Sequence, residues 1–193
     1  DALISWIKED NKEFLDDASL ENFELIQITL EKMEQLINGV LNYSSVNLDD
    51  NQNEDVDVNF LIKEVLSLLL VPSHIQIKSL NPLPIVKGDK IRLKQLFQNL
   101  IGNAIKFNDK ENGLIEIDVI SFKDYYQFSI SDNGIGIDEK YHEKIFDIFH
   151  SLNKTSTGIG LTIVKKIVDL HKGEIWLTSE PSKGATFYFT IKK

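Results

Sequence analysis

The sequence predicts an α+β fold in which an N-terminal helical hairpin precedes a mostly antiparallel sheet with helices on one face. Two observations lead to this prediction. Apolar residues keep a helical spacing up to about Tyr43, and a polar, acidic segment follows them. Beyond that segment, strand patterns of period two are interspersed with helical ones, as in a layered domain. We therefore expect two units, at residues 1–46 and 54–193.

The composition supports a folded chain and argues against several functions. Of the 193 residues, 42% are hydrophobic and 26% charged, with a net charge of −9. Nucleic-acid binding requires a basic face, so we expect no such partner, although a local pocket can still hold a nucleotide. The absence of cysteine excludes disulfides and thiolate metal sites. No apolar run approaches the ~20 residues of a membrane span, so we expect a cytoplasmic chain without membrane contact, either alone or as part of a membrane-anchored sensor.

The first unit is expected to be a hairpin of two helices. Asp1–Phe14 has roughly helical spacing, and Ser19 is the expected N-cap of the second helix. A narrow apolar stripe runs along that second helix at Leu20, Phe23, Ile26, Leu30, Met33, Ile37, Val40 and Leu41. Such a stripe requires partner helices. The first helix provides part of the contact, and we expect a homodimer to complete a four-helix bundle.

The second unit follows the acidic linker Ser44–Asp55. Strands are expected at 56–58, 75–78, 85–86, 114–122, 125–131, 174–179 and 185–191. Helices are expected at 60–70, from 90 to about 107, at 139–149 and at 160–171. Asn59 and Asp89 are the expected N-caps of the first two helices, and Gly173 is placed to end the last one.

The helix "RLKQLFQNLIGNAIKFND" has an unusual polar face. Gln95, Asn99, Asn103 and Lys106 follow one another at spacings of four, four and three residues, so they share one side. Asparagine is a poor helix former, and a merely solvated face would more often use lysine and glutamate. Amide oxygens beside an ammonium group suit Mg²⁺ and phosphate, so a binding site is the alternative to a solvated face.

Two glycine-containing segments suggest a nucleotide site. In "ISDNGIGID", a strand ends at Ser131, and the carboxylate of the following Asp132 can accept a hydrogen bond from an exocyclic amine. Gly134 and Gly136 would let the backbone approach a flat ligand closely, although an ordinary Asn-Gly turn also fits. In "TGIGL", Gly158 and Gly160 lead into a helix N-terminus, which is a place where anions bind.

Together, the three segments resemble the nucleotide-binding domain of histidine kinases, in the superfamily that includes DNA gyrase, Hsp90 and MutL. "NLIGNAIKF" is similar to the asparagine box of the family, "DNGIGI" and "TGIGL" to its two glycine boxes, and "IFDIF" to its phenylalanine box. The resemblance covers roughly Val56 to Lys192 and implies a Bergerat-type α/β sandwich. The helical hairpin resembles the end of the dimerisation and phosphotransfer domain, so the phosphoacceptor histidine is expected upstream of Asp1.

The resemblance also implies roles for individual residues. Asp132 is expected to hydrogen-bond the adenine amine, and Asn103 to bind Mg²⁺. Residues expected to contact the cofactors ATP and Mg²⁺ are Asn103, Lys106, Asp132, Gly134, Gly136, Ile137, Phe149, Thr157, Gly158, Ile159, Gly160 and Leu161. Residues expected to take part in phosphoryl transfer are Asn99, Lys106 and Lys154. We interpret His150 as a surface or loop histidine.

The implied activity is phosphoryl transfer to a protein histidine and then to the aspartate of a response-regulator receiver domain. ATP-hydrolysing members of the superfamily place a glutamate at the position of Asn99, which disfavours a gyrase-like ATPase here. An anti-sigma-type serine kinase is an alternative, but such kinases lack the long hairpin. Ser156 replaces a usual glycine, and Ser151 stands near the place of a common arginine. These departures leave open a degenerate module that only dimerises and signals.

Overall fold

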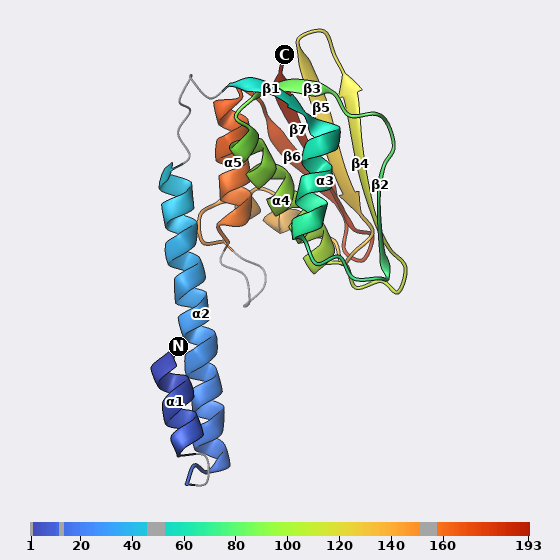
Figure 1. Cartoon of the computed structure of the whole chain (residues 1–193). Coiled ribbons are helices and arrows are strands. Elements are labelled where there is room, and N and C mark those ends of the chain that lie inside the picture. The colour runs from blue at the N-terminus through green and yellow to red at the C-terminus, as the bar shows by residue number, and fades with distance from the viewer. Residues whose placement is uncertain (1, 12–13, 46–52, 151–157) are drawn as a thin grey trace.

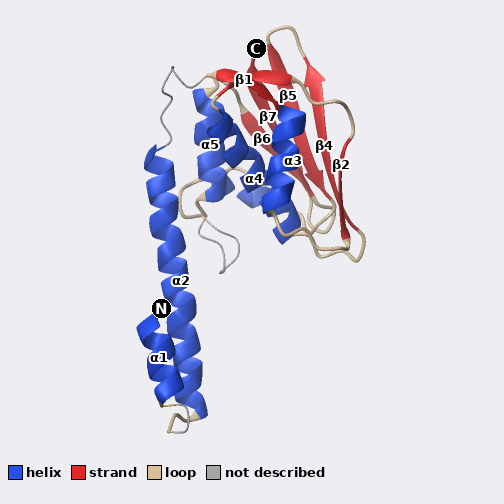
Figure 2. Cartoon of the chain, viewed as in Figure 1, coloured by secondary structure: helices blue, strands red, loops and turns tan. Residues whose placement is uncertain are grey.

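The computed structural model describes residues 2–11, 14–45, 53–150 and 158–193, and it contains a helical hairpin beside an α/β layer (Figure 1). The hairpin consists of α1 (Ala2–Asp10) and α2 (Asp17–Ser45). In the layer, α3 (Val58–Leu68), α4 (Lys90–Lys106) and α5 (Gly160–Leu170) cover one face of a sheet (Figure 2). The predicted α+β class is therefore confirmed.

The sheet is mixed but mostly antiparallel. Its strands are β2 (Ile75–Ser79), β4 (Gly113–Ser121), β5 (Tyr125–Asp132), β6 (Ile175–Ser179) and β7 (Ala185–Lys192). Their order is β2-β4-β5-β7-β6, in which only β2 and β4 pair in parallel. A separate antiparallel ribbon joins β1 (Glu54–Asp57) to β3 (Ile85–Gly88). This order places the C-terminal end of β5 beside the start of β7, and the candidate site lies there.

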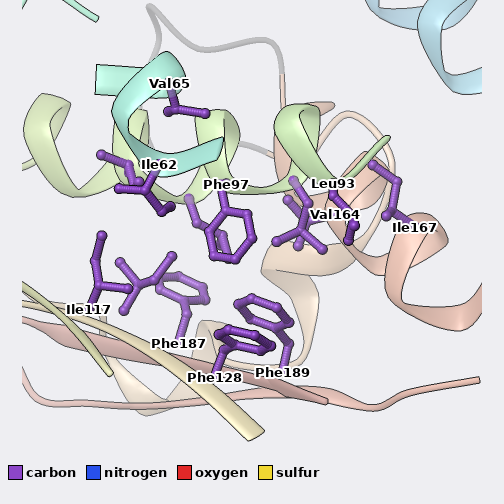
Figure 3. Packing of buried hydrophobic residues seen from close by; sticks show 14 of the residues in the cluster. Ile62, Val65, Leu93, Phe97, Ile117, Phe128, Val164, Ile167, Phe187 and Phe189 are labelled. Carbon is purple, nitrogen blue, oxygen red and sulfur yellow. The ribbon is translucent and has the colours of Figure 1, made fainter. Parts of the chain in front are cut away.

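Three phenylalanines join the helical layer to the sheet (Figure 3). Phe97 of α4 contacts Phe128 of β5 and Phe189 of β7 edge-on, with ring centroids 5.7 and 5.6 Å apart. The two strand rings stack on each other at 5.2 Å. All three side chains are fully buried. Such aromatic contacts hold α4 against the strands that carry the rest of the site.

The hairpin leaves much of its apolar stripe uncovered. Helix α1 lies beside the N-terminal part of α2 (Figure 1) and contacts it through Ser5, whose hydroxyl lies 3.5 Å from the amide of Gln27. Farther along α2, Met33, Ile37 and Leu41 are 52%, 58% and 60% exposed. Among the described residues, no helix is both long and apolar enough to cross a membrane.

Two predicted N-caps are wrong. Helix α2 begins earlier than expected, because Asp16 and not Ser19 caps it. The Asp16 carboxylate accepts a hydrogen bond from the backbone N–H of Ser19 at 2.8 Å. Helix α3 is capped by Asp57 instead of Asn59. The Asn59 amide instead exchanges two hydrogen bonds with the backbone of Leu83, which ties α3 to the segment before β3. Asp89 caps α4, as predicted.

The predicted helix at 139–149 is also wrong. Two short 3₁₀ turns, η2 (Glu139–Tyr141) and η3 (Lys144–Phe146), take its place. At the end of α5, Lys172 rather than Gly173 has the positive φ, at 53°. Gly173 is required for a different reason: a Cβ there would lie 1.9 Å from the carbonyl oxygen of Thr190.

Candidate functional site

A cavity of about 650 Å³ lies where α4, α5 and the ends of β5 and β7 meet. Amides of α4 line one side, Asp132 and the loop after it line another, and the start of α5 lines a third. Among the described lining residues, the formal charges are those of Asp132 and Lys106. The cavity is within the size range of small-molecule and cofactor sites, and it combines an apolar interior with a few polar groups.

Asp132 is the last residue of β5 and is held in place by the backbone. Its Oδ1 accepts hydrogen bonds from the N–H groups of Gly134 at 2.8 Å and Ala185 at 3.3 Å. Both bonds converge on one oxygen, so within the described part of the chain Oδ2 remains available to a ligand in the cavity. A carboxylate oriented in this way can accept a hydrogen bond from an amine.

Burial raises the pKa of the Asp132 carboxyl above its ordinary value of 3.8, and the N–H groups of Gly134 and Ala185 offset part of that rise. The folded chain therefore holds this proton more tightly than the unfolded chain does. Consequently, the stability contributed by Asp132 falls as the pH rises from 3.8 through the raised pKa.

We therefore expect Asp132→Asn to raise the melting temperature of the nucleotide-free chain at neutral pH, with the gain vanishing as the pH falls to 3.8. Thermal unfolding over this pH range measures the effect. Asp138→Asn is the matched control, because hydrogen bonding to Lys140 lowers the pKa of Asp138, so this substitution should not stabilise the chain. A lower melting temperature for Asp132→Asn at neutral pH would contradict the expectation.

The glycines after β5 allow backbone segments to pack against one another. A Cβ at Gly134 would lie 2.3 Å from the carbonyl oxygen of Phe107, at the end of α4. Gly136 has a φ of 69°, and a Cβ there would lie 2.0 Å from the carbonyl oxygen of Glu180. Of these two glycines, Gly136 lines the cavity. Asn133 holds the same loop against β4, because its Oδ1 accepts a hydrogen bond from the N–H of Leu114 at 2.8 Å.

The amide face of α4 turns toward the cavity, as its spacing predicts. Asn99, Asn103 and Lys106 all line it. The Asn99 amide nitrogen donates to the carbonyl oxygen of Gln95 at 2.8 Å, and its Oδ1 faces Gly160 at the start of α5. An amide oxygen at Asn103 can coordinate a hard cation such as Mg²⁺.

Helix α5 presents its N-terminus to the cavity. Gly158, with a φ of 71°, and Ile159 precede the helix, and no side chain of the described residues caps it. The first N–H groups of α5, at Gly160 and Leu161, have no acceptor within the helix and lie at the positive end of its dipole. Such a helix end binds phosphate readily.

The structure therefore gathers most of the residues expected to bind the cofactors. The cavity is lined by Asn99, Asn103, Lys106, Asp132, Gly136, Ile137, Gly158, Ile159, Gly160 and Leu161. Gly134 supports the loop without lining the cavity. Phe149 does not line it either, and its side chain is 55% exposed. Lys154, Ser156 and Thr157 lie outside the described residues.

The sequence reasoning missed other lining residues. His150, interpreted as a surface or loop histidine, lines the cavity, and its Nδ1 is buried without a hydrogen-bond partner in the described structure. Ala185 and Phe187 of β7 form part of the apolar wall. Their contribution depends on the pairing of β5 with β7 across more than fifty residues of sequence, so no local pattern could reveal it.

The comparisons with known proteins agree with this geometry. Residues 88–193, more than half of the chain, match the family of histidine kinase-, DNA gyrase B- and HSP90-like ATPases. The chain belongs to this family. Within this ATPase family, its similarities are to histidine kinases and phytochromes, so the matched residues form an ATP-binding domain of the histidine-kinase type.

Three of the similar proteins illustrate how far the similarity to this chain extends. Cyanobacterial phytochrome B of Nostoc sp. strain PCC 7120 is 40% identical over 97% of this chain and 26% of its own length. The adaptive-response sensory kinase SasA of Prochlorococcus marinus strain MIT 9313 is 34% identical over 92% of this chain and 51% of its own length. The structure of histidine kinase ThkA in complex with response regulator TrrA matches with a TM-score of 0.72 and 28% identity, covering 99% of this chain and 57% of that one. The chain thus spans between a quarter and about half of the two curated relatives.

Proposed function

We propose that this chain is the ATP-binding core of a sensor histidine kinase, which transfers the γ-phosphoryl group of ATP to a histidine upstream of Asp1. One observation carries the proposal: a single cavity joins the carboxylate of Asp132, the amide of Asn103 and the open N-terminus of α5. Bound ATP would supply the phosphoryl group, and Mg²⁺ would neutralise charge on the phosphates. Phosphoryl transfer requires mainly positioning and electrostatic stabilisation from the protein.

Each residue set has a defined part in binding. Asp132 would accept a hydrogen bond from the adenine amine through Oδ2, while Gly134 and Ala185 hold its other oxygen. At the other end of the ligand, the N–H groups at the start of α5 would hold phosphate oxygens. Asn103 would provide the protein ligand to Mg²⁺, and Lys106 would add positive charge beside it. The groups proposed to contact the ligand all line the cavity.

The presence of asparagine at position 99 favours phosphoryl transfer to a protein over hydrolysis of ATP. The amide nitrogen of Asn99 is engaged by the Gln95 carbonyl, and an amide cannot act as a carboxylate base toward water. The site could therefore bind ATP as a phosphoryl donor, but the side chain at position 99 could not activate a water molecule to hydrolyse it. We propose that the acceptor is a histidine, and that a response-regulator aspartate receives the group next, in keeping with the ThkA relative, which was solved with a response regulator.

We further propose that residues 1–46 are part of a dimerisation and phosphotransfer hairpin. The uncovered side chains of Met33, Ile37 and Leu41 follow one stripe of α2. Burying such a stripe between two copies of the hairpin would remove this apolar surface from water. A homodimer is thus the assembly that this helix supports.

Calorimetric titration of ATP, with Mg²⁺ or with EDTA, tests the metal role of Asn103. We expect the unsubstituted chain to bind ATP more tightly with Mg²⁺. Asn103→Ala should weaken binding in Mg²⁺ by roughly tenfold, the size of one lost charge-assisted contact, and should lose most of the response to Mg²⁺. Asn112→Ala, an exposed loop asparagine, is the matched control.

Two outcomes would count against the proposal in different ways. If Mg²⁺ increased the ATP affinity of Asn103→Ala as much as that of the unsubstituted chain, Asn103 would not be a metal ligand. No ATP binding by the unsubstituted chain would remove the proposed function as a whole.

A further inference from the structure

The nucleotide cavity has a wall that comes from the hairpin. Asn38 and Gly39 of α2 line the same cavity as Asp132 and the start of α5. Helix α2 runs beside α5 and contacts it (Figure 1). Leu36, on the same stretch of α2, packs against the hydrophobic core of the ATP-binding domain. The hairpin helix is therefore seated directly on the edge of the site.

Gly39 makes this close seating possible. A Cβ at position 39 would lie 2.5 Å from Cδ1 of Ile159 and 3.2 Å from its Cγ2. Ile159 is 1% exposed, so its side chain has little space in which to move away. Ile159 also stands between Gly158 and Gly160, at the phosphate-binding end of α5. The absence of a side chain at Gly39 thus brings the backbone of α2 against the phosphate end of the cavity.

The cavity-facing side of α2 is distinct from its uncovered apolar stripe. At 100° per residue, Gly39 lies about 160° around the helix from Ile37, the middle of the stripe residues Met33, Ile37 and Leu41, whereas Asn38 lies about 100° from Ile37. A second copy of the hairpin centred on Ile37 would therefore leave Gly39 against Ile159, with Asn38 between the stripe and the cavity. One helix can contact a partner and the nucleotide site at the same time.

We propose that Asn38 is a nucleotide-binding residue, supplied by the hairpin to the phosphate end of the site. This inference rests on the proposed ATP-binding function. The Asn38 amide can donate a hydrogen bond to a phosphate oxygen, beside the N–H groups at the start of α5. Because binding energies are reciprocal, a nucleotide that Asn38 contacts also stabilises the seating of α2 on α5. The position of the hairpin and the occupancy of the site are coupled in this way.

Titration of the full chain with ATP and with AMP tests the role of Asn38. We expect Asn38→Ala to weaken ATP binding by about tenfold, as for one hydrogen bond to a charged group, and to leave AMP binding nearly unchanged. Asn22→Ala is the matched control: it makes the same change on the same helix, with the same gain in helix propensity, far from the cavity. Equal loss of ATP and AMP binding would point to disturbed folding and overturn the proposal.

A compensating pair tests the seating of α2. Gly39→Ala should weaken ATP binding, because its Cβ would push α2 away from Ile159. Ile159→Val removes Cδ1, the atom at 2.5 Å, so the double variant should recover most of the lost affinity. ATP binding that Asn38→Ala leaves unchanged would overturn this inference alone. A chain that binds no ATP at all would overturn the proposed function and the inference with it.

Discussion

Asp132→Ala should reduce the affinity for ATP by roughly 100-fold, the upper range for losing a hydrogen bond to a charged group in a buried site. The substitution removes the oxygen proposed to accept from the adenine amine. It also leaves the N–H groups of Gly134 and Ala185 without the acceptor that they now share. Both losses act at the same end of the cavity. Titration with ATP in Mg²⁺ measures the change.

Asp138→Ala is the matched control for this experiment. Asp138 lies six residues away and caps the 3₁₀ turn η2, but it does not line the cavity. We expect it to bind ATP within about twofold of the unsubstituted chain, since surface changes away from a site have small effects. Asp132 would lose its proposed role if both alanine variants bound ATP equally well.

Phe97→Ala should lower the free energy of unfolding by about 3–5 kcal/mol, the usual cost of deleting a buried phenylalanine. Phe97 is 0% exposed and contacts both Phe128 and Phe189 edge-on. Its removal would leave a cavity between α4 and the sheet. Because α4 also carries Asn99 and Asn103, we expect ATP affinity to fall as well. Urea unfolding measures the stability.

Phe60→Ala provides the comparison for Phe97→Ala. Phe60 belongs to α3 and is 56% exposed, with the ammonium group of Lys90 5.4 Å from its ring centroid. We expect its loss to cost about 1 kcal/mol or less, in line with an exposed cation–π contact. The assignment of Phe97 to the central core would be wrong if the two variants unfolded at the same urea concentration with equal slopes.

Local patterns were sufficient to predict much of the site. The spacing of Asn99, Asn103 and Lys106 placed them on one face of α4, because 3.6 residues per turn determine which side chains share a face. The strand before Asp132, predicted to end at Ser131 and observed to end one residue later, and the glycine entry to α5 were likewise visible as local changes of pattern.

The errors arose where a distant part of the chain decided the role of a residue. Asp57 and Asn59 are both good N-caps, and the backbone of Leu83 decided between them by engaging the Asn59 amide. The glycine at 134 was expected to face a ligand, but the carbonyl of Phe107 is what excludes a side chain there. Both deciding partners lie more than twenty residues away in the chain.

The sequence by itself determined the class of fold, the helical hairpin and the order of the binding motifs, because these depend on periodicity and local backbone preference. The tertiary structure alone decided that Ala185, His150 and Asn38 share a cavity with Asp132. The physical reason is that pairing of β5 with β7, and seating of α2 on Ile159, are contacts between distant segments. Such contacts follow from shape and burial in the folded chain, which no short window of sequence contains.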